Sequence, residues 1–241
     1  MAALLTPLGG AVRSARTDRH GGVSTGVYAS LDLAGHVGDD PDAVVRNRSI
    51  LADDLGTTAD RLVAMEQVHG ADVVTVEVPM RPPVADALVT AVPDLWLTVL
   101  AADCVPLVLA DPAAGLVGVA HAGWRGFAAG VVGATVERMV ALGASPTTLR
   151  GLVGPAICGR CYEVGPEVVD AVALLAPAAV TTTRTGTPAV DLVRGVVDVL
   201  TAAGVAVEVD GRCTFEDTGL YSFRRDGVTG RHAAVVGLVP A

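Results

Sequence analysis

Cys104 and His121 lie seventeen residues apart in one apolar stretch, ADCVPLVLADPAAGLVGVAHAGWRG. The letters DPAA in its middle predict a type I turn, because proline supplies the φ angle that the second position of such a turn needs. The flanking segments then pair as a hairpin in which Cys104 faces His121, or Ala122 if Gly115 forms a bulge. In either register the thiol and the imidazole lie on neighbouring strands, where they could share a metal ion or a proton.

His69, in EQVHGAD, is a third candidate, because it also lies at a strand boundary, where a side chain can project into a cleft. Two imidazoles and one thiolate suit Zn²⁺ with a fourth position left for water or substrate, and copper accepts the same ligands. A bound metal would hold Cys104 as a thiolate and lower the pKa of a coordinated water. Asp103 and Asp111 are candidate general bases. The alternative is that Cys104 and His121 are ordinary buried residues of an apolar strand.

The letters GWRG directly after His121 place a tryptophan and an arginine between glycines at the start of a predicted helix. Trp124 could stack on a flat ring, and Arg125 could bind a phosphate or a carboxylate. Trp124 could equally fill the core while Arg125 forms a surface ion pair. Two further interpretations stay open: a hydrolase in which Cys104 is the nucleophile and His121 its base, and a protein that binds a partner through GWRG.

Cys158 and Cys161 form a C-x-x-C motif in CGRC. The sequence has no second C-x-x-C, which a structural zinc site would use, and CGRC lacks the surroundings of a thioredoxin-type site. Four cysteines in a chain of this size also do not form a disulfide framework. The motif by itself therefore predicts no function beyond a weak redox activity.

Hydrophobic periodicity predicts the elements that position these residues. Strands are predicted within 62–78, at 85–90, 95–111, 115–122, 205–209 and 232–239, helices at 39–56, 126–142 and 191–203, a strand, turn and helix within 149–176, and loop at 17–38. The apolar runs from 85 to 122 are typical of strands that are covered on both faces. The whole pattern predicts a mixed α/β domain with helices outside a central sheet system, without repeats or linkers.

Length, charge and composition exclude several classes of function. A chain of 241 residues can bury a core that needs no disulfides, and a net charge of −9 argues against affinity for nucleic acid or anionic lipid. The chain has no signal-peptide pattern and no apolar run of membrane-spanning length, so a cytoplasmic protein is predicted. All 17 basic residues are arginine, which excludes lysine chemistry.

Five motifs together resemble those of the bacterial laccase-domain family, whose members are described as multicopper polyphenol oxidases and as purine nucleoside phosphorylases with adenosine deaminase activity. The motifs are QVHGADV, ADCVPLVLAD, HAGWRG, GPAIC with CYEVG, and CT with YSFRRDGVTGR, in the family's order. The similarity runs from RHGGVS at Arg19 to beyond GRHAAV at Gly230, which is nearly the whole chain.

This resemblance implies one domain over residues 1–241, with α-β-β-α layers, mixed sheets and a cysteine-hydrolase-like fold. It also implies a Zn²⁺ ion bound by His69, Cys104 and His121. The implied reactions are the phosphorolysis of adenosine, inosine, guanosine and S-methyl-5′-thioadenosine, and the hydrolytic deamination of adenosine. Relatives are also linked to copper-dependent phenol oxidation and to the editing of peptidoglycan precursors, in which Cys104 would act as a nucleophile.

A phosphorylase must hold phosphate against the anomeric carbon of the ribose while the purine leaves, a task for arginines, whereas the open zinc position would serve deamination. Cys104, His121 and Asp103 are the catalytic candidates. The predicted substrate-binding residues are Arg19, Ser24, Arg48, Trp124, Arg125 and Arg225. A copper oxidase is a minor alternative, because three ligands with a single cysteine cannot assemble the several copper centres that four-electron reduction of oxygen requires. The sequence does not predict the oligomeric state.

Overall fold

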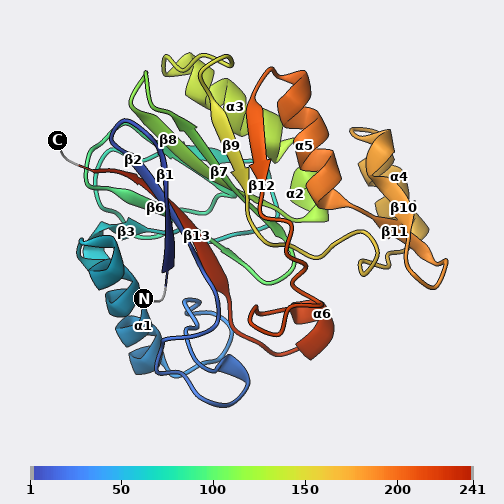
Figure 1. The fold of residues 1–241 in the computed structure, drawn as a ribbon, viewed down its shortest axis with the longest axis horizontal. Coiled ribbons are helices and arrows are strands. Elements are labelled where there is room, and N and C mark those ends of the chain that lie inside the picture. Colours follow the sequence, from blue (N-terminus) through green and yellow to red (C-terminus); the bar gives the residue numbers. More distant parts are fainter. Residues whose placement is uncertain (1–2, 240–241) are drawn as a thin grey trace.

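The apolar runs of the sequence form two mixed β-sheets that pack face to face (Figure 1). The structure, a computed structural model, describes residues 3–239. The five-stranded sheet contains, in spatial order, β1 (Ala3–Gly9), β2 (Val12–Thr17), β13 (His232–Leu238), β6 (Trp96–Ala101) and β3 (Leu62–Val63). The six-stranded sheet contains β12 (Ala206–Val209), β9 (Arg150–Val153), β7 (Val105–Asp111), β8 (Leu116–Ala122), β5 (Ala87–Thr90) and β4 (Val73–Thr75). A separate hairpin pairs β10 (Val180–Thr182) with β11 (Pro188–Val190).

Helix α1 (Pro41–Leu55) covers the outer face of the five-stranded sheet, and α3 (Val131–Ala141) and α5 (Leu192–Ala202) cover that of the six-stranded sheet (Figure 1). The other helices are α2 (Trp124–Ala128), α4 (Pro166–Ala173) beside the β10–β11 hairpin, and α6 (Phe223–Asp226), with 3-10 turns at Gly26–Tyr28, Ala59–Arg61 and Pro177–Ala179. Helix α1 begins and ends as its sequence predicts: the Asp40 side chain caps its first turn, and Gly56 ends it with a left-handed backbone at φ 72°.

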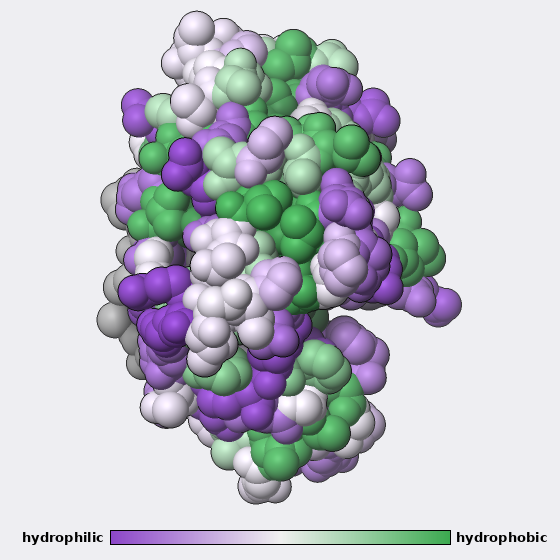
Figure 2. Space-filling model, turned by 90° about the vertical axis from the view of Figure 1, so that its right-hand side faces the viewer, coloured by the Kyte–Doolittle hydropathy of each residue, from purple (hydrophilic) through white to green (hydrophobic). Residues whose placement is uncertain are grey.

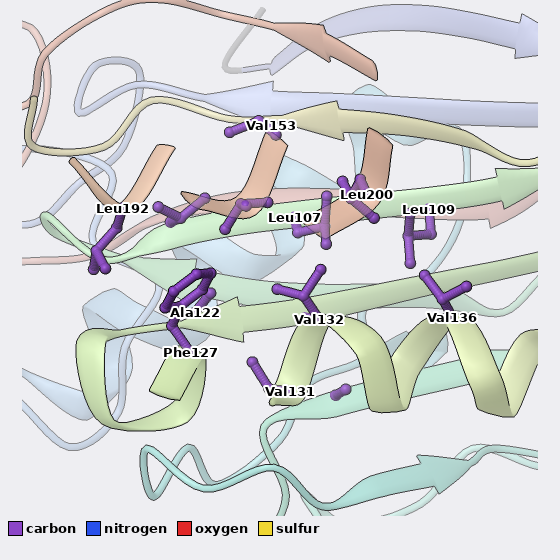
Figure 3. Close-up of a cluster of buried hydrophobic side chains, with 14 of the residues drawn as sticks. Leu107, Leu109, Ala122, Phe127, Val131, Val132, Val136, Val153, Leu192 and Leu200 are labelled. Carbon is purple, nitrogen blue, oxygen red and sulfur yellow. The ribbon is translucent and has the colours of Figure 1, made fainter. Parts of the chain in front are cut away.

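Three clusters of buried side chains fill the three interfaces of this four-layer arrangement. Leu51 of α1 packs against Trp96 on the five-stranded sheet. Leu97 and Val108 belong to the cluster between the two sheets. Helices α3 and α5 pack on the six-stranded sheet through a cluster that includes Leu107, Phe127, Val132 and Leu200 (Figure 3). These contacts confirm the predicted α/β class with α-β-β-α layers and mixed sheets in a single domain.

The apolar run at 95–111 is two strands in different sheets, which corrects the prediction of one continuous strand. Strand β6 ends at Ala101 in the five-stranded sheet, and β7 begins at Val105 in the six-stranded sheet. At the crossing, Asp103 has a φ of 103°, and its carboxylate accepts hydrogen bonds from Thr214 and Ser222. Periodicity misses the crossing, because residues on both sides of it are buried.

The hairpin of β7 and β8 has a longer loop than the predicted two-residue turn. Its ladder closes at Asp111 and Leu116, so that Pro106, not Cys104, faces His121. The Asp111 carboxylate accepts hydrogen bonds from two backbone N–H groups inside the four-residue loop, which stabilises the longer connection. Both predicted registers are therefore wrong. The shift from the direct register is two residues, which keeps His121 on the predicted face of its strand.

Two other predicted elements are interrupted. The helix predicted at 126–142 is divided into α2 and α3, because Gly130 adopts a φ of 89°, which favours glycine and ends a helix. Within 62–78 the chain is extended only in the short strands β3 and β4. The β1–β2 and β10–β11 hairpins carried no prediction from the sequence.

The outer surface adds two observations. Within residues 3–239, none of the helices combines the length and the apolar composition that crossing a membrane demands. On the face that carries α4 and the β10–β11 hairpin, hydrophilic and hydrophobic residues are interspersed (Figure 2).

The contact between Phe127 of α2 and Gly195 of α5 gives a test of the packing. Phe127 is fully buried, and a Cβ atom added at Gly195 would lie 2.7 Å from its ring. We expect Phe127→Ala to lower the free energy of unfolding by about 3–5 kcal/mol, and Gly195→Ala by about 1–3 kcal/mol. In the Phe127→Ala background, Gly195→Ala should instead raise the free energy of unfolding, because its methyl group then enters a cavity and alanine has the higher helix propensity. Urea unfolding of the four proteins measures this, and additive losses would contradict it.

Candidate metal centre

The structure brings His69, Cys104 and His121 together at one end of the β7–β8 hairpin. Their ligand atoms all lie within 4.8 Å of one another. The Cys104 sulfur is 3.9 Å from Nε2 of His69, close to the separation of about 3.6 Å that tetrahedral zinc imposes on a sulfur and a nitrogen ligand. The two imidazole rings meet edge to face, with their centroids 4.8 Å apart. The three residues can therefore bind one metal ion with little rearrangement.

A buried carboxylate, that of Asp86, positions both histidines. It accepts hydrogen bonds from the backbone N–H groups of Val68, His69 and Gly70, which form the turn that carries the His69 side chain. It also accepts a 2.8 Å hydrogen bond from Nδ1 of His121. Nε2 of His121 is thereby left as a metal ligand, as in other sites in which a carboxylate orients the imidazole. Asp86 is not among the residues predicted from the sequence, although an acid at the head of the apolar strand 85–90 is a usable signal.

The glycines of HAGWRG make room for the site. A Cβ atom at Gly123 would lie 2.7 Å from the His69 ring and 3.0 Å from the Cys104 sulfur, and one at Gly126 would lie 2.8 Å from the carbonyl oxygen of Gly70. These approaches are too close for any side chain. The backbone that follows β8 therefore closes tightly over the turn that carries His69.

The charges of the site favour a thiolate. Burial alone would raise the pKa of Cys104, but hydrogen bonds from His121 and His69 outweigh it and lower that pKa to about 6. Burial would likewise lower the pKa of His121, but Asp86 and the Cys104 thiolate raise it to about 9. Without metal, the proton therefore lies on His121 beside the Cys104 thiolate. A metal ion that binds both residues would displace this proton.

A cavity of about 260 Å³ opens at these ligands. It is also lined by His36, Gln67, Leu100, Ala101, Ala102, Phe223 and Arg231. Arg231 brings a positive charge to the cavity, and Phe223 is 59 % exposed. Both residues belong to the C-terminal motif YSFRRDGVTGR, of which only Arg225 was predicted to bind substrate.

None of the six predicted substrate-binding residues lines this cavity. Ser24 is buried, and its hydroxyl donates to Asp39. The guanidinium group of Arg48 donates twice to the carbonyl oxygen of Leu33. Arg19 donates to a backbone carbonyl and stacks on a tyrosine ring. In these three the polar group is already engaged in holding the N-terminal loop.

The remaining three occupy two other places. Arg225 donates to the carbonyl oxygens of Thr214, Phe215, Asp217 and Leu220 and pairs with Asp226. Arg125 is exposed and lies over the ring of Trp124, 4.3 Å from its centroid. Trp124 is half-buried against the core below α2. Their roles in substrate binding stay predictions.

The two predicted acids have partners of their own. Asp103 directly precedes Cys104 in the chain. Its carboxylate accepts hydrogen bonds from two hydroxyl groups and from the backbone N–H of Arg224. Asp111 closes the opposite end of the hairpin and lies away from the ligands. Asp103 therefore fixes the loop that carries Cys104, and its catalytic role also stays a prediction.

Comparisons with known proteins show the family and agree with the fold. The family described as multi-copper polyphenol oxidoreductase laccase matches residues 13–239. The chain is 49 % identical, over 96 % of both chains, to a protein of Streptomyces griseus named purine nucleoside phosphorylase ORF3. It is 50 % identical to a purine nucleoside phosphorylase of Streptomyces coelicolor, covering 92 % of this chain and 93 % of that one. A crystal structure of a Neisseria meningitidis protein superposes with a TM-score of 0.91 at 35 % identity over both whole chains.

Proposed function

Because the chain belongs to the multi-copper polyphenol oxidoreductase laccase family, we propose that the cavity at His69, Cys104 and His121 is the active site of a zinc-dependent purine nucleoside phosphorylase. The observation that carries the proposal is the convergence of three ligands, which leaves one position free, at the floor of a cavity that Arg231 also lines. Relatives that share about half of the sequence carry the name of this activity. The three ligands suit either zinc or copper. Zinc is proposed because one three-ligand site cannot assemble the several copper centres that four-electron reduction of oxygen requires.

The proposed substrates are adenosine, inosine, guanosine and S-methyl-5′-thioadenosine. Phosphate attacks the anomeric carbon while the bond to the purine breaks, so the site must hold an anion next to the sugar and stabilise the leaving base. When bound, zinc supplies a Lewis acid. Arg231 can hold the phosphate, and the exposed Phe223 ring can stack on the purine. We propose Arg231 as the phosphate ligand ahead of Arg19, Arg48, Arg125 and Arg225, because none of those four lines the cavity.

Adenosine deamination is the second proposed activity of the same cavity. It needs water at the purine ring and a group that moves protons, and His36 lies in the cavity for the second task. Burial and neighbouring arginines lower the pKa of His36, so that it is neutral and able to accept a proton at neutral pH. The free thiols of the described cysteines fit the reducing cytoplasm, where we place the enzyme.

One observation supports a different candidate. The low pKa of Cys104 beside His121 is also what a cysteine hydrolase needs, such as one that edits peptidoglycan precursors. Chelation separates the two proposals. A hydrolase of this kind keeps its activity without metal and loses it to a thiol reagent, whereas the phosphorylase loses its activity on chelation.

Incubation of the zinc-loaded protein with adenosine tests the proposal. With phosphate present, we expect adenine and ribose 1-phosphate in equal amounts, and inosine through the second activity whether or not phosphate is present. Arg231→Gln should raise KM for phosphate much more than KM for adenosine, whereas Arg125→Gln should leave both near the parent values. Chromatography of the bases measures this. Absence of phosphate-dependent adenine from the zinc-loaded protein would refute the phosphorylase proposal.

A further inference from the structure

A second cluster of metal-binding side chains lies outside the cavity. The sulfur atoms of Cys158, Cys161 and Cys213 and a carboxylate oxygen of Glu216 all lie within 4.8 Å of one another. We propose that these four residues bind a second zinc ion, which has a structural role. Three thiolates and one carboxylate make a complete tetrahedral set, so this site leaves no position for a substrate.

Two turns of the same design present the four ligands. In CGRC, the backbone N–H of Cys161 donates to the carbonyl oxygen of Cys158 at 2.9 Å; in CTFE, the N–H of Glu216 donates to that of Cys213 at 3.1 Å. Each turn brings its first and fourth side chains to the cluster. The pair has the C-x-x-C spacing of two-turn zinc sites, with glutamate in place of the last cysteine. That substitution hides the second turn from a search for cysteine pairs.

The sheet holds the two turns in place before any metal binds. They follow β9 and β12, which are neighbouring parallel strands, and a bridge between Ala156 and Cys213 extends this pairing up to the turns (Figure 1). The carboxyl ends of parallel strands lie at the same edge of a sheet. The ligands therefore meet because of the strand order, although 55 residues separate Cys158 from Cys213.

The distances fit zinc. The sulfur of Cys161 is 3.4 Å from Oε1 of Glu216, and bond lengths of about 2.3 Å to sulfur and 2.0 Å to oxygen would place such ligands about 3.5 Å apart around a tetrahedral ion. The backbone N–H of Cys158 donates to the sulfur of Cys213 at 3.3 Å, a contact that stabilises a thiolate ligand.

An arginine beside the cluster would balance its charge. Arg184 donates to the Cys161 sulfur and pairs with Glu216. Its charge would offset part of the negative charge that three thiolates and a carboxylate retain around Zn²⁺.

This second ion would support the first site through the backbone. Thr214, inside the second turn, donates to the Asp103 carboxylate at 2.6 Å, and Ile157, next to the first turn, donates to the Asp103 carbonyl oxygen at 3.0 Å. Asp103 precedes Cys104 in the chain. A metal ion that ties the two turns together thus also fixes the loop that carries the Cys104 thiol.

Metal content measured in a Cys104→Ala background tests the proposal without relying on activity. After purification under reducing conditions and dialysis against zinc, we expect two zinc ions per chain in the parent protein and one in Cys104→Ala. Cys104→Ala/Cys161→Ser should hold none. Phe215→Leu, in the same background and the same turn, should keep the ion, because Phe215 contributes no ligand. Circular dichroism verifies that each variant is folded.

A gain-of-binding variant covers the case in which the serine variant does not fold. Glu216→Cys completes the second C-x-x-C, so in the Cys104→Ala background it should keep one zinc ion and release it to a chelator more slowly than Cys104→Ala alone. Cobalt in place of zinc should show thiolate-to-metal absorption in the Cys104→Ala protein, stronger in Glu216→Cys. A Cys104→Ala protein without zinc, or with Cys158 and Cys161 joined in a disulfide under these conditions, would overturn the proposal.

Discussion

Replacing His121 by alanine should remove one zinc ion per chain and lower adenosine phosphorolysis by more than about a hundredfold. Loss of a residue that only orients a metal ligand already costs about 10- to 100-fold in affinity or activity, and His121 provides a ligand atom itself. The variant also leaves the Asp86 carboxylate without the 2.8 Å hydrogen bond from Nδ1 of the ring. Metal analysis and an assay of adenine release measure the two effects.

His20→Ala is the matched control for this prediction. His20 is an exposed histidine in the N-terminal loop, where its backbone N–H donates to Asp18, and its ring does not line the cavity. This control should keep the parent's zinc content and rate. Equal product from His121→Ala and the parent protein would show that the reaction takes place elsewhere. Chelation of the parent should reproduce the His121→Ala loss, and added zinc should restore activity to the parent alone.

The sequence predicted the meeting of Cys104 and His121 for a reason that is only partly correct. Turn chemistry placed the two strands side by side, but it assumed a two-residue loop where the Asp111 side chain stabilises four residues. The predicted proximity still holds, because a register shift of two residues leaves each side chain on the same face of the sheet. Cys104 itself lies just before β7, where the chain crosses between the sheets.

The substrate-binding residues could not be predicted in the same way. Whether a guanidinium group is free depends on the carbonyl groups that the fold brings to it, and four of these surround Arg225. Arg231 looks no different from Arg225 in the sequence. Its Nη1 donates to only two carbonyl oxygens, those of Thr229 and Gly230, and the residue lines the cavity. Residue type indicates the chemistry that a side chain could do, whereas long-range packing decides whether its polar atoms are available.

Asp86 shows the same limit for a residue that touches no substrate. Its two carboxylate oxygens receive four donors, three from the turn that carries His69 and one from the His121 ring, and the residue is fully buried. The three backbone donors reach Asp86 only in the folded protein, where residues 68–70 lie over the start of β5, so the sequence does not indicate them. Asp86 thereby couples the shape of a loop to the orientation of a ring on a different strand.

Asp86→Asn should therefore weaken zinc binding at the first site by about 10- to 100-fold and lower the free energy of unfolding by about 1–3 kcal/mol. An amide has one acceptor oxygen and adds two N–H donors, so at least one of the four buried donors loses its partner. The variant also removes the charge that raises the pKa of His121, so that pKa should fall from about 9 in the metal-free protein. Competition with a chelator, urea unfolding and titration by NMR measure the three effects.

Asp111→Asn separates the orientation of the ligands from stability alone. Asp111 is also buried, and its carboxylate also accepts four hydrogen bonds, but at the opposite end of the hairpin. Asp111→Asn should lower the free energy of unfolding about as much as Asp86→Asn does, while the zinc affinity of the first site and the pKa of His121 stay unchanged. If both variants lost zinc affinity equally, Asp86 would act only by stabilising the fold. A loss confined to Asp86→Asn would show that the buried carboxylate sets the geometry of both histidine ligands.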